Sequence, residues 1–295
     1  GTGMEITLTL IITQVLFGLA LGAVYIMMAS GLTIIFGLLD VVNFAHGTFY
    51  MLGAFAAYIV ISLFGNFWLG LPSAIILVGL IGWITESFLI KPLYGKDPLY
   101  PLLLTFGFSI AVTDLMRWIF GTIPKVIELP KGFAGSFIAG GIFIPKYRVF
   151  IICLTVAVLL FLWFFFKKTN LGMIIRAATR DSLMVRTLGI NVPRIWTFGF
   201  ALGVGLAGLG GAVNSSIVAA VPDMGVEMTV ECFVVVVIGG LGSLGGAILG
   251  GLIIGQVISF VSLFASDWSN VAIFLTMFLI LLVRTRGLFG EAGRL

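Results

Sequence analysis

Residues 6–39 read ITLTLIITQVLFGLALGAVYIMMASGLTIIFGLL, and this run contains no Lys, Arg, Asp or Glu. About 20 predominantly apolar residues suffice for a helix that spans a bilayer, so the run predicts a membrane-spanning segment. Further charge-free intervals cover 41–85, 195–222 and 232–266. Such segments are too long and too uniformly apolar for barrel strands, which alternate and run about 9–11 residues. The sequence therefore predicts an all-α transmembrane protein that crosses the lipid bilayer several times.

The overall composition supports the same class. Apolar residues make up 60% of the chain and charged residues 9%, with a mean hydropathy of +1.23. Soluble domains carry roughly a quarter charged residues. The net charge of +4 is low for nucleic-acid binding, so no nucleic-acid partner is expected. Cys153 and Cys232 both lie in apolar segments, without the spacing of a metal site or a disulfide framework, and are interpreted as core residues.

The chain divides into about eight apolar helical segments within a single membrane domain, residues 4–295. Gly1 to Gly3, ahead of Met4, are interpreted as a vector-derived or start-codon remnant. A mixed loop at 122–148 contains three prolines and charges of both signs. The apolar segments are expected at 6–36, 47–64, 67–90, 99–121, 149–166, 197–220, 232–264 and 268–283.

A basic loop at 167–196, KKTNLGMIIRAATRDSLMVRTLGINVPRIW, interrupts this apolar pattern. It holds six of the sixteen Lys and Arg residues and only one acid. Short basic loops between spans stay in the cytoplasm, and Arg284 and Arg286 predict the same side for the C-terminus. The loop also predicts an amphipathic helix that Gly189 ends. The expected apolar face consists of Met173, Ile174, Ala177, Ala178 and Met184.

The same loop is the largest predicted cytoplasmic surface, so it is the expected place for a contact with an energy-supplying partner. The chain has no GxxxxGK[ST] phosphate-binding sequence, since Gly95-Lys96 is followed by Asp97. It is therefore not expected to be an enzyme that hydrolyses ATP, and ATP energy would have to arrive through a contact at 167–196. The alternative is a positive-inside loop with incidental helicity.

Two hydrophobic runs are interrupted by residues that continue a helix poorly: GLLDVVNFAHG at 37–47 and GGLGSLGGAILGG at 239–251. Their positions look equivalent in the two halves of the chain. Paired broken segments point to a transport pathway, because irregular backbone at membrane depth is tolerated only inside protein or along a cavity. Close helix packing by glycine is the alternative. The candidate path residues are Asn43, His46, Gly47 and Thr48 in the first break and Gly240, Ser243 and Gly246 in the second.

Other ionisable residues have structural explanations. Asp114 and Arg117 lie three residues apart, which predicts a mutual ion pair on one helical face. Glu86 is expected near the membrane edge, and His46 is expected to donate a hydrogen bond that holds the first break. Glu227 and Glu231 are expected to precede a helix and to stabilise its N-terminus.

Four separated motifs also resemble one family. GLTIIFGLLDVVNFAHGTFYMLGAF at 31–55, NLGMIIRAATRDSLMVRTLGIN at 170–191, VVVVIGGLGSLGGAILGGLIIG at 234–255 and RTRGLFG at 284–290 are similar to LivH-type permeases of branched-chain amino acid ABC importers. The resemblance covers nearly the whole chain and is weakest at 122–148. At Thr48 the sequence departs from many members, which have an acidic residue after the His-Gly pair.

The resemblance implies a subunit of a bacterial importer in the cytoplasmic membrane. Its implied partners are a second, LivM-like permease, two cytoplasmic ABC ATPases that bind ATP and Mg, and a periplasmic or extracellular solute-binding protein. No cofactor or metal is implied for this chain. The implied ATPase-coupling residues are Arg176, Ala177, Ala178, Arg180, Asp181, Gly189, Ile190 and Asn191.

Branched-chain or other hydrophobic amino acids are the substrates that this resemblance implies, while urea, amides and aromatic carboxylates are carried by similar systems. The competing hypothesis is a self-sufficient secondary transporter or channel, in which the broken segments bind a small polar solute directly.

Overall fold

The computed structural model describes residues 8–139 and 142–290, so the expected remnant at 1–3 lies outside the described residues. Seven stretches within them are long and apolar enough to cross a membrane, and the last, Leu244–Val283, contains more than one helix. The prediction of a helical transmembrane protein is therefore confirmed. The helices are α1 Leu8–Leu39, α2 His46–Phe64, α3 Phe67–Thr85, α4 Leu99–Phe120, α5 Lys146–Lys168, α6 Asn170–Arg180, α7 Ser182–Thr187, α8 Val192–Asn214, α9 Met224–Gly239, α10 Leu244–Ala265 and α11 Ser269–Val283.

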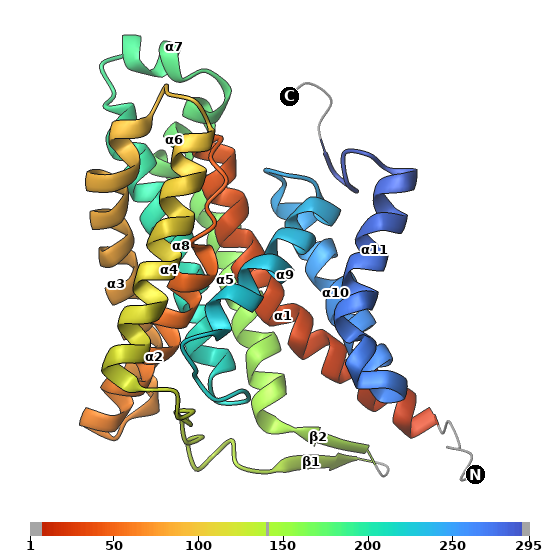
Figure 1. The fold of residues 1–295 in the computed structure, drawn as a ribbon. Helices are drawn as coiled ribbons and strands as arrows, with labels where there is room; N and C mark the ends of the chain where they lie inside the picture. The colour runs from red at the N-terminus through yellow and green to blue at the C-terminus, as the bar shows by residue number, and fades with distance from the viewer. Residues whose placement is uncertain (1–7, 140–141, 291–295) are drawn as a thin grey trace.

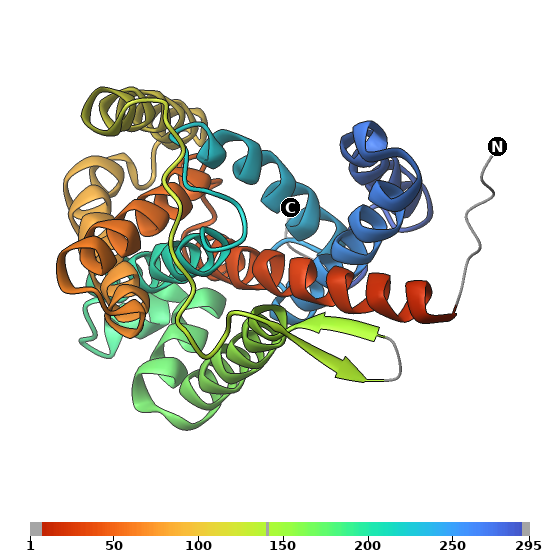
Figure 2. The ribbon, with the colours of Figure 1, turned by 90° about the horizontal axis from the view of Figure 1, so that it is seen from below.

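Helix α1 crosses the centre of the molecule at a slant, as Figures 1 and 2 show. It packs against α8, α9 and α10, while α2, α3 and α8 form a group on one side and α10 and α11 flank the other. At 1.5 Å per residue its 32 residues extend about 48 Å, more than the ~30 Å of a hydrocarbon core, so α1 has to tilt to stay in the membrane.

The two ends of the bundle differ. Helices α6 and α7 and the end of α11 lie at one end, which we call the inner end (Figure 1). The segment 121–145 lies at the opposite, outer end, where β1 Ser136–Ala139 and β2 Ile142–Pro145 form a short antiparallel hairpin that the sequence did not predict. Backbone bonds between Lys125 and Ala220, 2.9 and 2.8 Å long, tie this segment to the turn before α9.

The basic loop forms two helices instead of the one predicted. Asp181 adopts an extended conformation and ends α6, and its carboxylate accepts a 2.9 Å hydrogen bond from the Met184 N–H to cap α7. The predicted apolar face is only partly correct. Ala178 is buried and Ile174 half-buried, as expected, whereas Met173, Ala177 and Met184 are exposed. Gly172 and Ile175 are buried in place of these three, and Ala178 packs in a small cluster with Val185 and Val192.

Both predicted breaks exist, with shorter bounds. The first consists of residues 40–45, between α1 and α2. The second consists only of residues 240–243, because most of the glycine-rich run is helical and belongs to α10. Helix α9 begins at Met224 and not at 232, so the expected positions of Glu227 and Glu231 ahead of a helix are corrected below.

Candidate translocation and coupling sites

The first break ends in a buried junction where α2 begins. Asn43, His46 and Thr48 are all fully buried within the chain. The His46 Nε2–H donates to the Met28 carbonyl oxygen on α1 at 2.9 Å, which confirms the expectation that this ring holds the break. The Thr48 hydroxyl donates to Ser109 Oγ on α4 at 2.7 Å. Asp40, which a proton relay through His46 would need, is exposed at the far end of the break.

Hydroxyl groups from two other helices satisfy backbone groups at this junction. The Phe44 N–H donates to Thr105 Oγ1 on α4 at 3.2 Å, and the Gly47 N–H donates to Thr229 Oγ1 on α9 at 3.1 Å. First-turn N–H groups have no partner within their own helix, so the Thr229 hydroxyl takes the place of an ordinary N-cap, while Thr105 satisfies the N–H of a residue just before the helix. Neither threonine was predicted from the sequence.

The junction thus joins α1, α2, α4 and α9 with Asn43, His46, Gly47 and Thr48 at its centre. In the part of the chain that is described, Asn43 Nδ2 and His46 Nδ1 have no hydrogen-bond partner. Buried polar atoms of this kind are uncommon in folded proteins and call for an explanation. A role of these residues in the path remains a prediction.

The second break is a tight turn at the inner end. Gly240 has a φ of 101°, a conformation that favours glycine, and Ser243 Oγ accepts a 3.1 Å hydrogen bond from the Gly246 N–H to cap α10. A Cβ at Gly246 would lie 2.1 Å from the Gly239 carbonyl oxygen. Close packing therefore accounts for Gly246, and its path role stays a prediction.

The chain segment after α11 closes over the end of α9. The Leu288 N–H donates to the Ile238 carbonyl at 2.8 Å, and the Phe289 N–H donates to the Gly239 carbonyl at 2.9 Å. These bonds satisfy carbonyls that a helix end leaves free. The two breaks consequently have different surroundings: the first meets the start of α9, and the second meets the segment 287–290.

Helices α6 and α7 form a compact unit at the inner end, which we call the coupling unit (residues 170–191). Gly189, with a φ of 80°, ends its second helix, and Asn191 caps α8 through a 3.2 Å bond from the Arg194 N–H. Of the eight predicted coupling residues, Ala178 is buried and Ile190 is half-buried. The six exposed ones are Arg176, Ala177, Arg180, Asp181, Gly189 and Asn191.

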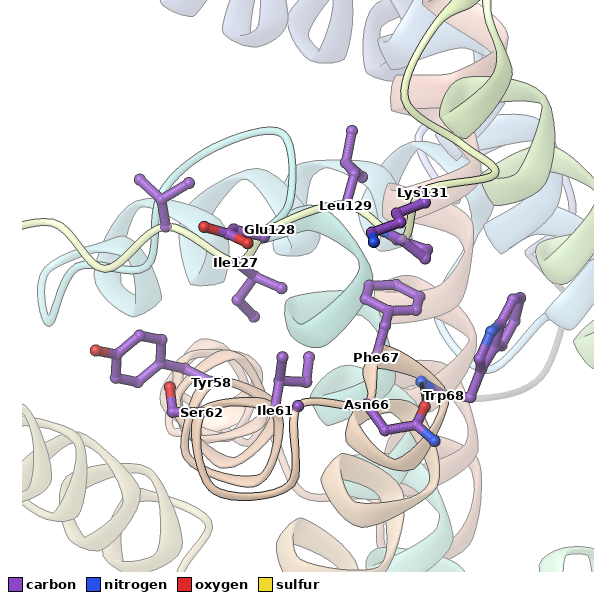
Figure 3. A pocket seen from close by; sticks show the side chains of 13 residues that line it. Tyr58, Ile61, Ser62, Asn66, Phe67, Trp68, Ile127, Glu128, Leu129 and Lys131 are labelled. Atoms are coloured by element: carbon purple, nitrogen blue, oxygen red, sulfur yellow. Dashed lines mark hydrogen bonds between the residues drawn. The ribbon is translucent and has the colours of Figure 1, made fainter.

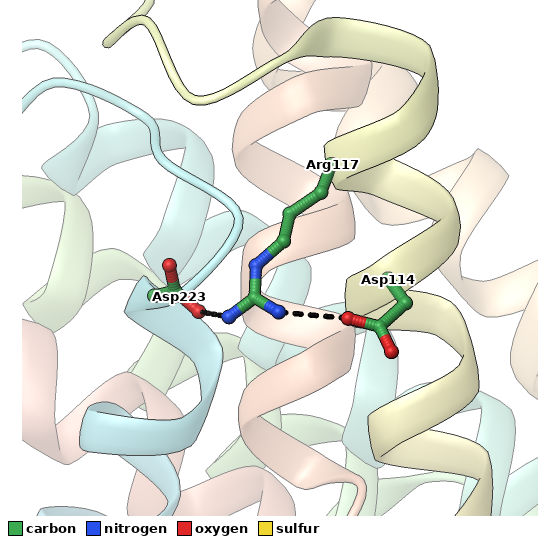
Figure 4. Close-up of polar contacts among 3 residues, drawn as sticks. All are labelled: Asp114, Arg117 and Asp223. Carbon is green, nitrogen blue, oxygen red and sulfur yellow. Dashed lines mark hydrogen bonds and ion pairs between the residues drawn. The ribbon is translucent and has the colours of Figure 1, made fainter.

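An ionic group lies at the outer end of α4. Arg117 binds Asp114 at 2.7 Å, which confirms the predicted pair, and also binds Asp223 in the turn before α9 (Figure 4). All three side chains are about half exposed. Asp223 was not predicted, because no local pattern relates it to α4.

Three isolated residues differ from expectation. Glu86 is fully buried within the protein and accepts a hydrogen bond from the Tyr94 hydroxyl, so it is not exposed at a surface; its position near the membrane edge stays a prediction. Glu231 lies two turns inside α9 and accepts from the Tyr25 hydroxyl on α1, whereas Glu227 does lie in the first turn of α9. Cys153 is exposed and not a core residue, while Cys232 is buried as expected.

A cavity of about 540 Å³ opens at the outer end between the α2–α3 turn and residues 126–131 (Figure 3). Phe67 and Trp68 form one wall, and Glu128 and Lys131 lie across from them. None of the predicted path residues lines it.

Comparison with known proteins gives a consistent result. A family described as "Branched-chain amino acid transport system / permease component" matches residues 14–282. The chain is 30% identical to the high-affinity branched-chain amino acid transport system permease protein BraD of Pseudomonas aeruginosa, over 94% of this chain and 95% of that protein. It is 28% identical to the permease protein LivH of Escherichia coli K12, with the same coverage, and 26% identical to LivM of Salmonella typhimurium, over 78% of this chain and 60% of that protein.

One solved structure shares the fold. It is described as PsaBC from Streptococcus pneumoniae in complex with Fab, and it aligns with a TM-score of 0.51 at 15% identity over 95% of this chain and 92% of that chain.

Proposed function

This chain belongs to the branched-chain amino acid transport permease family, and we propose that it works as the membrane subunit of an importer driven by ATP through the coupling unit. ATP and Mg would be bound by two separate cytoplasmic ABC ATPases. The exposed apolar surface of α6 and α7 carries this proposal.

That surface has the composition of a protein contact. Leu171, Met173, Leu183, Met184 and Leu188 are between 46% and 72% exposed. They lie in α6, in α7 and in the residue that follows α7, outside the long apolar spans, and groups of exposed apolar side chains mark interaction sites. The neighbouring charges are mostly basic: Arg176, Arg180 and Arg186. An ATPase with an apolar groove and an acidic rim would fit this surface.

The distribution of basic residues supports a cytoplasmic inner end. Basic residues concentrate on the cytoplasmic side of membrane proteins, and this orientation also places the end of α11 in the cytoplasm. Arg117, Lys125, Lys131, Lys146 and Arg148 belong to the outer end, whereas the inner end has Lys91, Lys96, Lys167, Lys168, Arg176, Arg180, Arg186, Arg194, Arg284 and Arg286.

A second permease subunit would complete the path. Helix α9 is largely buried, yet Val226, Glu227 and Val230 along one side of it are exposed. A glutamate facing lipid is costly, so this side should face protein or water. The match to LivM, a permease of the same kind of system, supports a LivM-like partner on this side of α9. Substrate would then pass between the two subunits.

At the outer end, a solute-binding protein would deliver the substrate. The cavity beside Trp68, with Glu128 and Lys131 at its rim, offers an aromatic and charged surface for that contact. The names of the relatives support branched-chain amino acids as the substrate class.

Reconstitution tests the proposal. The chain would be expressed with the ATPases, second permease and binding protein proposed as its partners, purified through a tag on this chain, and placed in proteoliposomes. We expect the ATPases to copurify, and we expect leucine uptake to require both ATP and the binding protein. Uptake by this chain alone, without ATP, would instead establish a self-sufficient transporter.

A further inference from the structure

The inner end of α3 contains three kinds of helical turn in succession. The α-helix ends at Thr85, a π-helical turn covers Glu86–Ile90, and a 3₁₀ turn covers Lys91–Leu93. π-Helical turns are rare and often occur at functional sites. The helical hydrogen-bonding pattern therefore changes twice between Thr85 and Leu93.

Glu86 begins the π turn with a carboxyl group that no water reaches. Its side chain is fully buried, and the Tyr94 hydroxyl donates a hydrogen bond to Oε1. The second oxygen, Oε2, has no partner among the described residues. Burying a carboxyl group is costly, and packing alone would be better served by an apolar residue.

Tyr94 connects this carboxyl to α8. Its ring meets the ring of Trp196 edge to face, with centroids 5.1 Å apart and planes at 82°. Edge-to-face ring pairs hold a defined geometry because the ring edge is positive and the face negative. The indole Nε1 of Trp196 is buried and, within the described residues, also has no hydrogen-bond partner.

Trp196, near the start of α8, in turn contacts the coupling unit. The guanidinium of Arg186 on α7 lies 5.5 Å from the centroid of its indole ring. The ring also packs on the cluster of Ala178, Val185 and Val192, which holds α6, α7 and α8 together. A displacement of α7 must therefore move Trp196 or break these contacts.

Arg186, Trp196, Tyr94 and Glu86 form a continuous line of contacts from the coupling unit to the π turn of α3. We propose that this line transmits the movement of the coupling unit to α3, with Tyr94 as the positioning residue that ties ATP hydrolysis to transport. The rigid rings of Trp196 and Tyr94 transmit the displacement of α7, and the hydrogen bond from Tyr94 to Glu86 sets its direction. The π turn then changes its conformation. This inference rests on the proposed docking of the coupling unit on an ATPase.

The unpartnered atoms at both sides of Tyr94 fit such a device. One is a donor, Trp196 Nε1, and the other is the oxygen Glu86 Oε2. Unmade hydrogen bonds of this kind cost free energy in the present state, so a second state that satisfies them is favoured to the same extent. If the contact were purely structural, these polar atoms would be expected to have partners, and no free energy would favour a second conformation.

The test measures the number of ATP molecules hydrolysed per solute imported by the complete reconstituted complex. Tyr94→Phe removes the hydroxyl and keeps the ring. We expect its ATP hydrolysis to stay near the wild-type rate and its leucine uptake to fall about tenfold, because the free energy of one buried hydrogen bond corresponds to about that factor. Trp196→Phe should raise the same ratio. Tyr100→Phe, which changes an exposed tyrosine on α4, is the matched control and should leave the ratio unchanged.

Two results would overturn the proposal. One is an unchanged ratio in both variants, and the other is an equal loss of hydrolysis and uptake, which a merely structural role predicts. If Tyr94→Phe does not fold, Trp196→Phe alone decides between these outcomes. Leu183→Asp tests the proposed ATPase docking separately from the role of Tyr94. If this variant loses the ATPases while Tyr94→Phe keeps an unchanged ratio of ATP to solute, the line of contacts through Tyr94 is refuted and the proposed function stands. Retention of ATPases and full uptake in Leu183→Asp would refute the docking itself.

Discussion

The backbone of Gly47 at the start of α2 touches the backbone of Gly225 at the start of α9. A Cβ at Gly47 would lie 1.9 Å from the Gly225 carbonyl oxygen, and a Cβ at Gly225 would lie 2.7 Å from the Gly47 carbonyl oxygen. The two helix ends are therefore in direct backbone contact, with the Thr229 hydroxyl beside them. This contact links the first break to the helix that we propose to line the path.

Replacing Gly47 with alanine should separate these helix ends. Overpacking of a tight contact costs about 1–3 kcal/mol, and backbone atoms cannot turn away as side chains do. We expect a clear fall in the thermal unfolding temperature of the purified protein in detergent. Gly107→Ala is the control, because a Cβ at this position in α4 meets nothing within 4 Å. Equal stability of the two variants would mean that the contact is loose.

The coupling unit should respond differently to charge on its surface and in its interior. Leu183 is 72% exposed, so Leu183→Asp should keep the fold but lose the copurifying ATPases. Ala178 is buried, so Ala178→Asp should cost about 3–5 kcal/mol, as unpaired buried charges do, and should lower the yield of folded protein. Affinity purification and thermal unfolding check the two outcomes. Val126→Asp, an exposed change at the outer end, should retain the ATPases. ATPase retention by Leu183→Asp would contradict the docking surface.

The turn at the second break should be sensitive to a single methyl group. A Cβ at Gly240 would lie 2.5 Å from the Gly290 backbone nitrogen. Gly240→Ala should therefore displace the segment 287–290. The side chains of Arg284 and Arg286 are already exposed, and loosening the backbone beside them should speed their cleavage by trypsin. Gly245→Ala, where the nearest atom lies 4.0 Å away, should be cleaved no faster than the unsubstituted protein. The rate of trypsin cleavage measures the difference, and equal rates would show that the segment is held by other contacts.

The ionic group at the outer end should contribute little to the isolated chain. Exposed ion pairs are worth about 0–1 kcal/mol and weaken with salt. Arg117→Met should accordingly lower the thermal unfolding temperature of the isolated chain only slightly. Thermal unfolding at low and high salt measures this. A loss several times larger in the assembled complex, but not in the isolated chain, would show that a partner covers Arg117.

One side of α9 should be accessible to water if it lines the path. Val230→Cys, on a background in which the exposed Cys153 is replaced by serine, should react with small water-soluble thiol reagents in the assembled complex. Val156→Cys, equally exposed but on the apolar helix α5, should face lipid and remain unreactive. Labelling is followed by mass spectrometry. No reaction at 230 in any nucleotide state would remove this side of α9 from the path.

Features that depend on neighbouring residues were predictable from the sequence. Charge-free runs predicted the spans, and the polar residues of 37–47 and the glycines of 239–251 predicted where the helices stop. The Asp114–Arg117 pair followed from helical spacing. Each of these properties is set within a few residues along the chain.

Features that depend on distant residues were not predictable. Thr105 and Thr229 satisfy backbone N–H groups at the start of α2 from two other helices, and a single threonine in an apolar run carries no signal of that role. Glu231 made the start of α9 look polar, so the helix was expected to begin at 232; the Tyr25 hydroxyl on α1 is what makes this carboxylate tolerable inside the helix. The extended backbone at Asp181 divided α6 from α7, and this changed which side of the coupling unit is buried.

The closure of α9 by Leu288 and Phe289 also sets an order for biogenesis. The ribosome adds Leu288 fifty residues after Ile238, so α9 reaches the translocon before the groups that cap it exist. Until then the carbonyls of Ile238 and Gly239 need water at the bilayer surface. In the nascent chain the C-terminal end of α9 should therefore stay without its hydrogen-bond partners. This end of the subunit can complete its folding only after Leu288 and Phe289 have been synthesised.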